Sequence, residues 1–196
     1  LLKANQIVLR TNDFQSAAQQ IYNLLKQQIP ISSGYLALQS GNSPCILLND
    51  VHEASDAVPS PSTTTGLRAI ACREKQTLFE NDLTPDLIDF LLEGQAPPSN
   101  AMIVPIVLSE QMKGWFALFD KSTDFRTEDA RQAHALAEVA ALALERSQHL
   151  EAIQTSEEQH RHAQAVAHIG HWELSAYDTA PKWSDEIFRI FGLDPQ

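Results

Sequence analysis

Histidines are the side chains with metal-binding or acid–base chemistry that cluster most closely in this sequence. Five of the seven lie between residues 149 and 171, namely His149, His160, His162, His168 and His171. A metal site needs side chains that converge on one point, but His160 and His162 are two residues apart on a predicted helix and therefore face apart. His160 could serve as a phosphoacceptor, yet residues 156–162 are polar all round and lack the apolar context of such a site. We expect solvated histidines and no bound metal.

Two cysteines are the other reactive side chains. Cys45 lies in a predicted strand and Cys72 in a predicted helix, and two thiols do not make a disulfide scaffold. A reducing compartment fits this pair. Free cysteines usually behave as small buried hydrophobic residues, so we expect that role for both.

Sequence motifs of the common enzyme classes are missing. The chain contains no Gly-x-Gly-x-x-Gly, no Gly-Lys-Ser/Thr phosphate loop, no His-Glu-x-x-His and no Gly-x-Ser-x-Gly. The motifs of a histidine-kinase ATP-binding domain and the GGDEF signature of a diguanylate cyclase are missing as well. We therefore expect no catalytic residues in this chain.

The composition is that of an acidic globular protein. The chain has 196 residues, of which 43% are hydrophobic, and a net charge of −11 at pH 7. Negative surface charge repels nucleic acid and anionic lipid, and no apolar run approaches the ~18 residues of a membrane span. We expect a cytoplasmic protein with no nucleic-acid partner and no membrane contact. The chain begins at Leu1 without Met, and we expect it to be a piece of a longer protein.

Apolar periodicity predicts an α+β fold. Helices are expected at residues 14–25, 67–71, 84–93 and 127–168, and strands at residues 34–39, 45–49, 77–80, 101–108 and 114–119. Asn12 or Asp13 would cap the first helix, and Pro105 within a strand indicates an edge position or a bulge. The order of these elements predicts a central antiparallel sheet flanked by helices from both ends of the chain.

Several segments, in their order and spacing, resemble a GAF domain. They are the helix and strand of residues 66–71 and 75–82, the strand of residues 99–105, the Gly-Trp-Phe-Ala-Leu run of residues 114–118, and the Phe-Arg-Thr-Glu-Asp run of residues 125–129. The resemblance covers about residues 5–148. It implies a GAF-like sensor domain at residues 1–148, with a central antiparallel sheet and a long C-terminal helix.

A second resemblance covers the end of the chain. Residues 167–174 and 183–195 look like the start of a PAS domain, with a β-hairpin and a short helix. This resemblance implies the N-terminal part of a truncated PAS domain at residues 169–196. Because most of a PAS sheet is missing, we expect this segment to be poorly packed on its own.

Residues 149–168 are the expected signalling helix or coiled-coil linker between these domains. The predicted helix runs for about 40 residues without Gly or Pro, and a helix of that length usually lies against a partner. Heptad spacing gives a seam that is apolar at Val139, Ala143, Leu150 and Ile153 and polar further on. We therefore expect a homodimer that pairs through this helix.

The expected ligand site is a pocket between the sheet and the helices of residues 66–93. Its candidate lining residues are Leu67, Ile70, Cys72, Phe79, Leu87 and Met102. Plain core is the favoured interpretation of these residues, and no convergent polar groups among them indicate a particular ligand. A bilin is not supported because Arg73, rather than His, follows Cys72. Haem and cyclic nucleotides are not supported either, so the cofactor stays unknown.

Together, the two resemblances imply a sensory or regulatory input module of a signal-transduction protein. Changes that depend on a small-molecule ligand or a partner would pass through the dimeric helix to a downstream output domain in the same chain. The first expected output is a sensor histidine kinase of a two-component system. The alternatives are a ligand-free dimerisation and interaction scaffold, or the input region of a diguanylate cyclase or phosphodiesterase.

Overall fold

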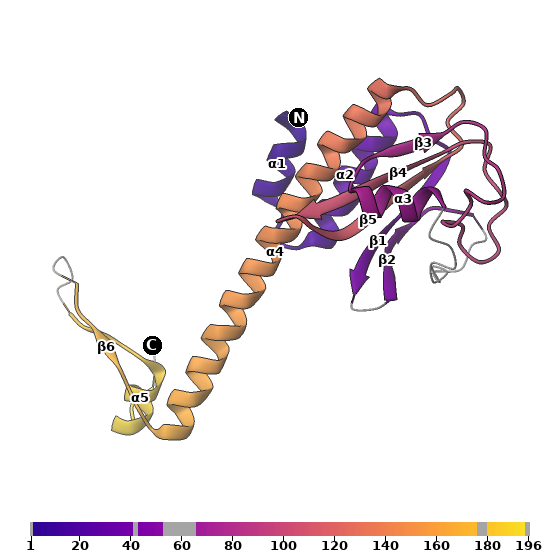
Figure 1. Cartoon of the computed structure of the whole chain (residues 1–196). Helices are drawn as coiled ribbons and strands as arrows, with labels where there is room; N and C mark the ends of the chain where they lie inside the picture. Colours follow the sequence, from indigo (N-terminus) through magenta and orange to yellow (C-terminus); the bar gives the residue numbers. More distant parts are fainter. Residues whose placement is uncertain (1, 41–42, 53–65, 176–179, 195–196) are drawn as a thin grey trace. The chain divides into compact units, whose positions relative to one another are not determined.

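The chain divides into two compact units, residues Leu1–Ser147 and Gln148–Gln196. The computed structural model describes residues 2–40, 43–52, 66–175 and 180–194 (Figure 1). No helix in these ranges is long and apolar enough to cross a membrane.

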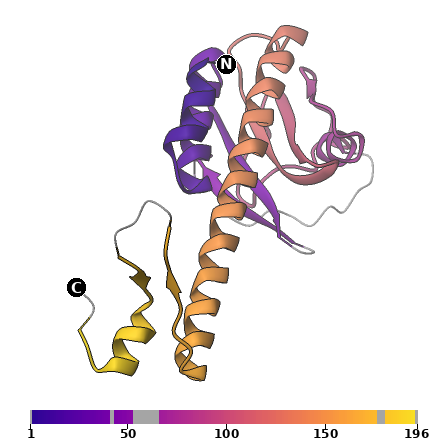
Figure 2. The ribbon, with the colours of Figure 1, turned by 90° about the vertical axis from the view of Figure 1, so that its left-hand side faces the viewer.

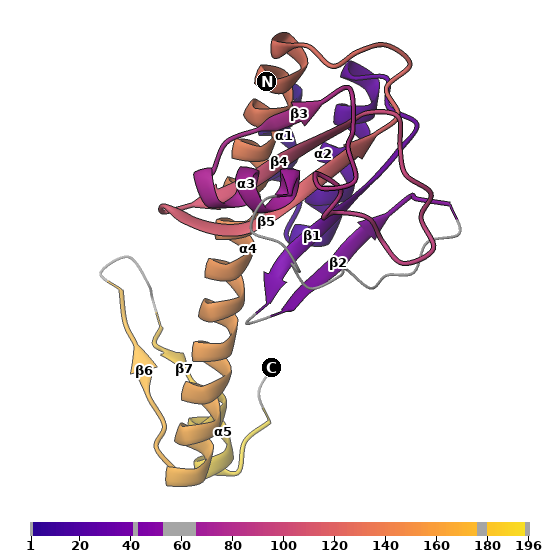
Figure 3. The ribbon, with the colours of Figure 1, turned by 45° about the vertical axis from the view of Figure 1, so that its right-hand side comes forward.

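A five-stranded sheet with the strand order β2-β1-β5-β4-β3 forms the centre of the first unit. All neighbouring strands are antiparallel (Figures 1 and 3). The strands are β1 (Ser33–Ser40), β2 (Ser43–Asn49), β3 (Leu78–Glu80), β4 (Ala101–Leu108) and β5 (Gln111–Phe119). The predicted α+β class, with an antiparallel sheet, flanking helices and a long C-terminal helix, is confirmed.

Pro105 lies inside the sheet at a point where its missing N–H is tolerated. The short strand β3 pairs with β4 only as far as Ile103, so Pro105 is beyond the end of that ladder. A register shift follows directly, between Ile106 and Val107. Strand β4 is therefore an inner strand for its first three residues and an edge strand at Pro105, which a proline requires.

Helices α1 (Leu2–Arg10), α2 (Phe14–Gln28) and the first part of α4 (Thr127–Ala167) cover one face of the sheet (Figure 2). Asp13 begins α2, because its side chain accepts a hydrogen bond from the Ser16 amide at 2.7 Å. Strand alternation sends Met102 and Val104 into this helical core. The helix α1 was not predicted from the sequence.

Helix α3 (Leu67–Glu74) and the chain segment 87–92 cover the opposite face of the sheet. Ala101 and Ile103, which alternate with the residues above, face this second core. The segment 84–93 was predicted to be helical, but it contains only turns and irregular backbone. The prediction was wrong because the backbone hydrogen bonds inside this segment form short turns, such as Leu87 N–H to the Thr84 carbonyl, while the Leu87 carbonyl and the Asp89 carboxylate bind the start of α3.

Helix α4 is continuous over 41 residues and belongs to both units. Its buried residues all fall in the first half: Ala133, Leu136, Ala137, Val139, Ala140, Ala141, Ala143 and Leu144. Asn81 fixes the chain just before the helix by accepting from the Phe125 amide at 2.7 Å and donating to the Phe125 carbonyl at 3.0 Å. The helix thus starts from a fixed point at the end of β3.

The second unit contains the end of α4, the short strands β6 (Trp172–Glu173) and β7 (Lys182–Trp183), and helix α5 (Asp185–Phe191). The two strands pair antiparallel, and Trp172 is opposite Trp183. Gly192 ends α5 with a positive φ of 67°, the conformation that favours glycine after a helix.

Candidate functional site

The N-terminus of α3 is closed by a carboxylate from a distant part of the chain. Asp89 accepts hydrogen bonds from the amides of Arg68 and Ala69, both at 2.8 Å. The Leu67 amide donates to the Leu87 carbonyl at 3.0 Å. Helix N-termini leave unsatisfied N–H groups, and here the segment 87–89 takes the place of a local cap.

Arg68 and Asp89 form a buried ion pair beneath this helix end. Their side chains are only 4% and 2% exposed, and Arg68 Nε lies 3.6 Å from Asp89 Oδ2. The Arg68 guanidinium also lies over the Trp115 ring, 5.5 Å from its centroid. Because an isolated buried charge is costly, the pair, the helix amides and the indole face stabilise one another.

Tyr35 on the neighbouring strand β1 extends this polar cluster along the same face of the sheet. Its hydroxyl donates to the Phe90 carbonyl at 2.7 Å and accepts from Trp115 Nε1 at 3.4 Å. Burial raises the pKa of Tyr35 well above its usual value, although the neighbouring Trp115 and Arg68 oppose this shift. The phenol is therefore a neutral hydrogen-bonding group, and the cluster can hold the segment 87–90 against the sheet.

The structure splits the six predicted pocket residues between the two faces of the sheet. Leu67 and Cys72 pack in the core under α3. Phe79 and Met102 belong to the helical core on the opposite face. The remaining two, Ile70 on α3 and Leu87, are half-buried. One cavity cannot be lined by all six, and the structure brings Leu67, Leu87 and Cys72 to the same side.

Cys72 has the environment of an unreactive thiol. Burial raises its pKa to about 12, with Arg68 lowering it and Asp89 raising it as smaller influences. Cys45, by contrast, is exposed on β2, so its predicted burial was wrong. Cys45 lies near the start of the edge strand β2 (Ser43–Asn49).

The charged and aromatic residues of this cluster were not predicted from the sequence. Arg68 directly follows Leu67 on a short predicted helix. An arginine next to an expected core residue could have indicated a buried charged group. Asp89 was hidden by the wrong assignment of residues 84–93 to a helix. Only the tertiary fold brings Asp89 to α3 and Trp115 beneath Arg68.

The predicted dimer seam also divides into two parts. Val139 and Ala143 are 3% and 5% exposed because they pack in the core of the first unit. In the second unit Leu150 is half-buried and Ile153 is 56% exposed. Val139 and Ala143 therefore belong to the core of the first unit, whereas Leu150 and Ile153 lie outside it.

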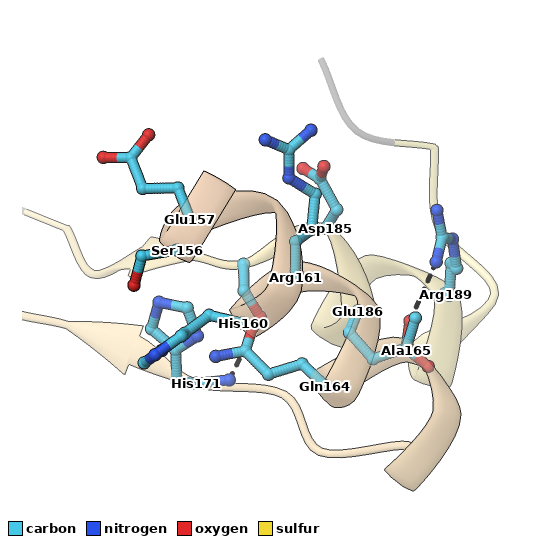
Figure 4. A pocket seen from close by; sticks show the side chains of 11 residues that line it. Ser156, Glu157, His160, Arg161, Gln164, Ala165, His171, Asp185, Glu186 and Arg189 are labelled. Atoms are coloured by element: carbon cyan, nitrogen blue, oxygen red, sulfur yellow. Dashed lines mark hydrogen bonds and ion pairs between the residues drawn. The ribbon is translucent and has the colours of Figure 1, made fainter. Parts of the chain in front are cut away.

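The second unit contains an open polar hollow of about 600 Å³ (Figure 4). His160 and Arg161 of α4 line it together with His171, Asp185 and Glu186. All five clustered histidines are exposed, as predicted. In the part of the chain that the structure describes, no three His, Cys, Asp or Glu side chains are arranged to hold a metal ion.

Comparison with solved structures shows the fold of the first unit in other proteins. A free methionine-R-sulfoxide reductase from Neisseria meningitidis is 17% identical with a TM-score of 0.60, over 75% of this chain and 87% of that one. A methyl-accepting chemotaxis protein fragment is 16% identical with a TM-score of 0.62, over 76% of this chain and 99% of that one. The GAF domain of a Coxiella burnetii phosphoenolpyruvate-protein phosphotransferase is 14% identical with a TM-score of 0.63, over 76% and 93%.

A comparison with curated protein sequences gave no match. The GAF domain family matches residues 11–145, which is most of the chain and almost all of the first unit. The match includes the sheet, the capped helix α3 and the buried half of α4. The chain therefore belongs to the GAF domain family.

Proposed function

We propose that this chain is a sensory input module of a signal-transduction protein. GAF domains act as sensory and regulatory modules in signalling proteins, and two structural neighbours are a chemotaxis protein and a phosphotransferase GAF domain. The chain would detect a small molecule or a partner with its first unit. It would pass the change through α4 to a downstream output domain, for which a sensor histidine kinase is our first expectation.

The observation that carries this proposal is that helix α4 begins in the first unit and ends in the second. One continuous helix contributes Leu136 and Leu144 to the core of the GAF domain and then continues to Ala167 in the second unit. Cores are close-packed, so a rearrangement on the helical face of the sheet must move this helix. A helix that is rigid over its length carries such a shift beyond the domain.

The start of α4 also contacts the segments that directly follow strands β5 and β3. Lys121 Nζ lies 3.0 Å from Asp129 Oδ2 in the first turn, and both side chains are largely buried. Asn81 binds Phe125 from the end of β3, which directly follows the α3 region. A change around α3 would therefore reach the start of the relay helix along the chain, through β3 and the two hydrogen bonds of Asn81.

We also propose that this chain is not itself an enzyme. One structural neighbour is a methionine-R-sulfoxide reductase, and thiols are the redox groups that this chain could offer. Thiol chemistry needs the thiolate, whereas Cys72 is kept neutral by burial, which raises its pKa to about 12. Cys45 lies on the exposed side of the edge strand β2, away from the α3 core.

A ligand-free scaffold is the second candidate function. Tyr35, Phe90 and Phe119 fill the core under α3 and are fully buried, with ring centroids 5.4 Å apart for Phe90 and Phe119. Such packing suits a module that only dimerises and spaces other domains. The two candidates differ in whether a small molecule binds the first unit.

Native mass spectrometry of the purified 196-residue chain tests the proposal. A retained non-covalent molecule, lost on denaturation, would support the sensory function, and its mass would begin to identify the signal. A ligand-free dimer would favour the scaffold. A chain that is monomeric and ligand-free at every concentration would contradict both the relay through paired helices and the scaffold.

A further inference from the structure

Helix α4 ends in a conformation that glycine usually adopts, but a histidine occupies the position. His168 has a positive φ of 52°, and the following Ile169 amide donates to the Gln164 carbonyl at 3.0 Å. This is the usual hydrogen bonding of a helix C-terminus with a left-handed residue. A side chain here strains the backbone, so a histidine at this position suggests that its ring has a use.

The His168 ring meets a buried carboxylate of α5. Its Nδ1 lies 3.1 Å from Glu186 Oε1, while Arg189 Nη1 lies 3.0 Å from Glu186 Oε2 (Figure 4 shows the second contact). The Glu186 side chain is only 7% exposed, whereas both partners are largely exposed. A buried carboxylate needs such partners, and one of them comes from the end of α4.

The backbones of the two segments also approach closely. A Cβ at Gly170 would lie 2.3 Å from Ile187 Cγ1 and 3.1 Å from the Ile187 nitrogen, so only glycine fits there. Ile187 is itself buried. One residue further on, the His171 amide donates to Ser184 Oγ at 3.0 Å, and the Ser184 amide donates to the His171 carbonyl at 2.9 Å.

We propose that residues 168–171 and 184–187 form a rigid joint, centred on Glu186, that fixes the direction in which α5 leaves the end of α4. Three kinds of contact act over four residues on each side: a hydrogen bond between the His168 ring and the Glu186 carboxylate, close packing of Gly170 on Ile187, and a reciprocal pair of hydrogen bonds between His171 and Ser184. A rotation of the end of α4 then carries α5 with it. This inference rests on the proposed relay function and specifies how the signal leaves the helix.

Hydrogen exchange of the whole 196-residue chain, read by mass spectrometry, tests the joint. Glu186→Gln keeps the shape of the side chain but removes the charge that His168 and Arg189 share. We expect exchange in residues 168–175 and 184–191 to rise about tenfold, because charge-assisted hydrogen bonds are lost. Asp194→Asn removes the same charge from an exposed residue outside the joint and should change neither segment.

A second variant acts on the packing rather than on the charge. Gly170→Ala should loosen the same two segments, since its methyl group would collide with Ile187. Residues 148–160 of α4 serve as an internal reference and should exchange as in the unmodified chain. The joint is refuted if both variants behave like Asp194→Asn, or if the unmodified chain shows no protection in either segment.

The joint and the proposed function can fail separately. Native mass spectrometry that shows neither a ligand nor a dimer would remove the sensory function while leaving the joint intact. A retained ligand together with unprotected residues 184–191 would keep the sensory function and remove the joint. In that case the signal would have to leave α4 before His168.

Discussion

Asp89 fits against Gly66 so closely that a Cβ at position 66 would lie 2.1 Å from Asp89 Cγ. Gly66 is the residue before the first turn of α3, and Asp89 binds the amides of that turn. The missing side chain at position 66 therefore lets a carboxylate from the segment 87–92 reach the helix end. The contact with Asp89, which is distant in the sequence, explains why position 66 is a glycine.

Gly66→Ala should destabilise the first unit by about 2–3 kcal/mol, as overpacking of a filled site usually does. Urea denaturation followed by circular dichroism would measure this change. In an Asp89→Gly background, which also removes the Asp89 Cβ that would lie 2.3 Å from the new methyl group, the effect of Gly66→Ala should become much smaller. Equal effects of Gly66→Ala in both backgrounds would show that the two residues do not meet.

Asp89→Ala alone should cost about 3–5 kcal/mol, because it leaves Arg68 as an uncompensated buried charge.

Asn81 should fix the start of α4 by side-chain hydrogen bonds to the backbone, as Asp89 does for α3. Asn81→Ala removes both hydrogen bonds to Phe125, and we expect a loss of about 1–3 kcal/mol together with faster amide exchange in residues 125–131. Asn81→Asp should be at least as harmful, since a carboxylate oxygen would face the Phe125 carbonyl. The exposed neighbour Asp82, changed to Asn, is the matched control and should leave both measurements unchanged.

Local patterns predicted those elements whose stabilising contacts are local. The start of α2 followed from the capping side chain of Asp13, and the length of α4 followed from the missing Gly and Pro. The helix expected at residues 84–93 had a good local start, but Asp89 binds α3 instead, and no sequence window contains both partners. Helix α1 was missed because its apolar side is short, with Ile7 as its buried residue among those described.

The candidate site was harder to predict than the fold. Strand alternation already implied that Phe79 and Met102, which pair in register, share one face, while Leu78 and Ile103 share the other. The apolar pattern could not show which face α3 covers, so residues from both faces were combined in one pocket. The buried ion pair of Arg68 with Asp89 was out of reach, because charged residues are normally expected at the surface.

The two cysteines should differ strongly in reactivity. With a pKa of about 12, Cys72 carries about one part in ten thousand of thiolate at pH 8. Cys45→Ser leaves Cys72 as the only thiol, and labelling with Ellman's reagent should then be at least about a hundredfold slower than in Cys72→Ala. Both variants should react alike in concentrated urea. Fast labelling of Cys72 in the folded chain would contradict its buried, neutral state and would reopen thiol chemistry as a function.

Charge substitutions along α4 should separate folding from dimerisation. Val139→Asp would place a carboxylate in the GAF core, so we expect the first unit to unfold or lose several kcal/mol of stability, on the order of 3–5 kcal/mol. Leu150→Asp and Ile153→Asp act outside that core, so the thermal unfolding of the first unit should be unchanged. If the helices pair there, light scattering after size exclusion should show a dimer that becomes a monomer in both variants. Gln154→Asp, a charge on the same exposed stretch, should remain dimeric, and a dimer that survives Leu150→Asp and Ile153→Asp would place the pairing surface elsewhere on the chain.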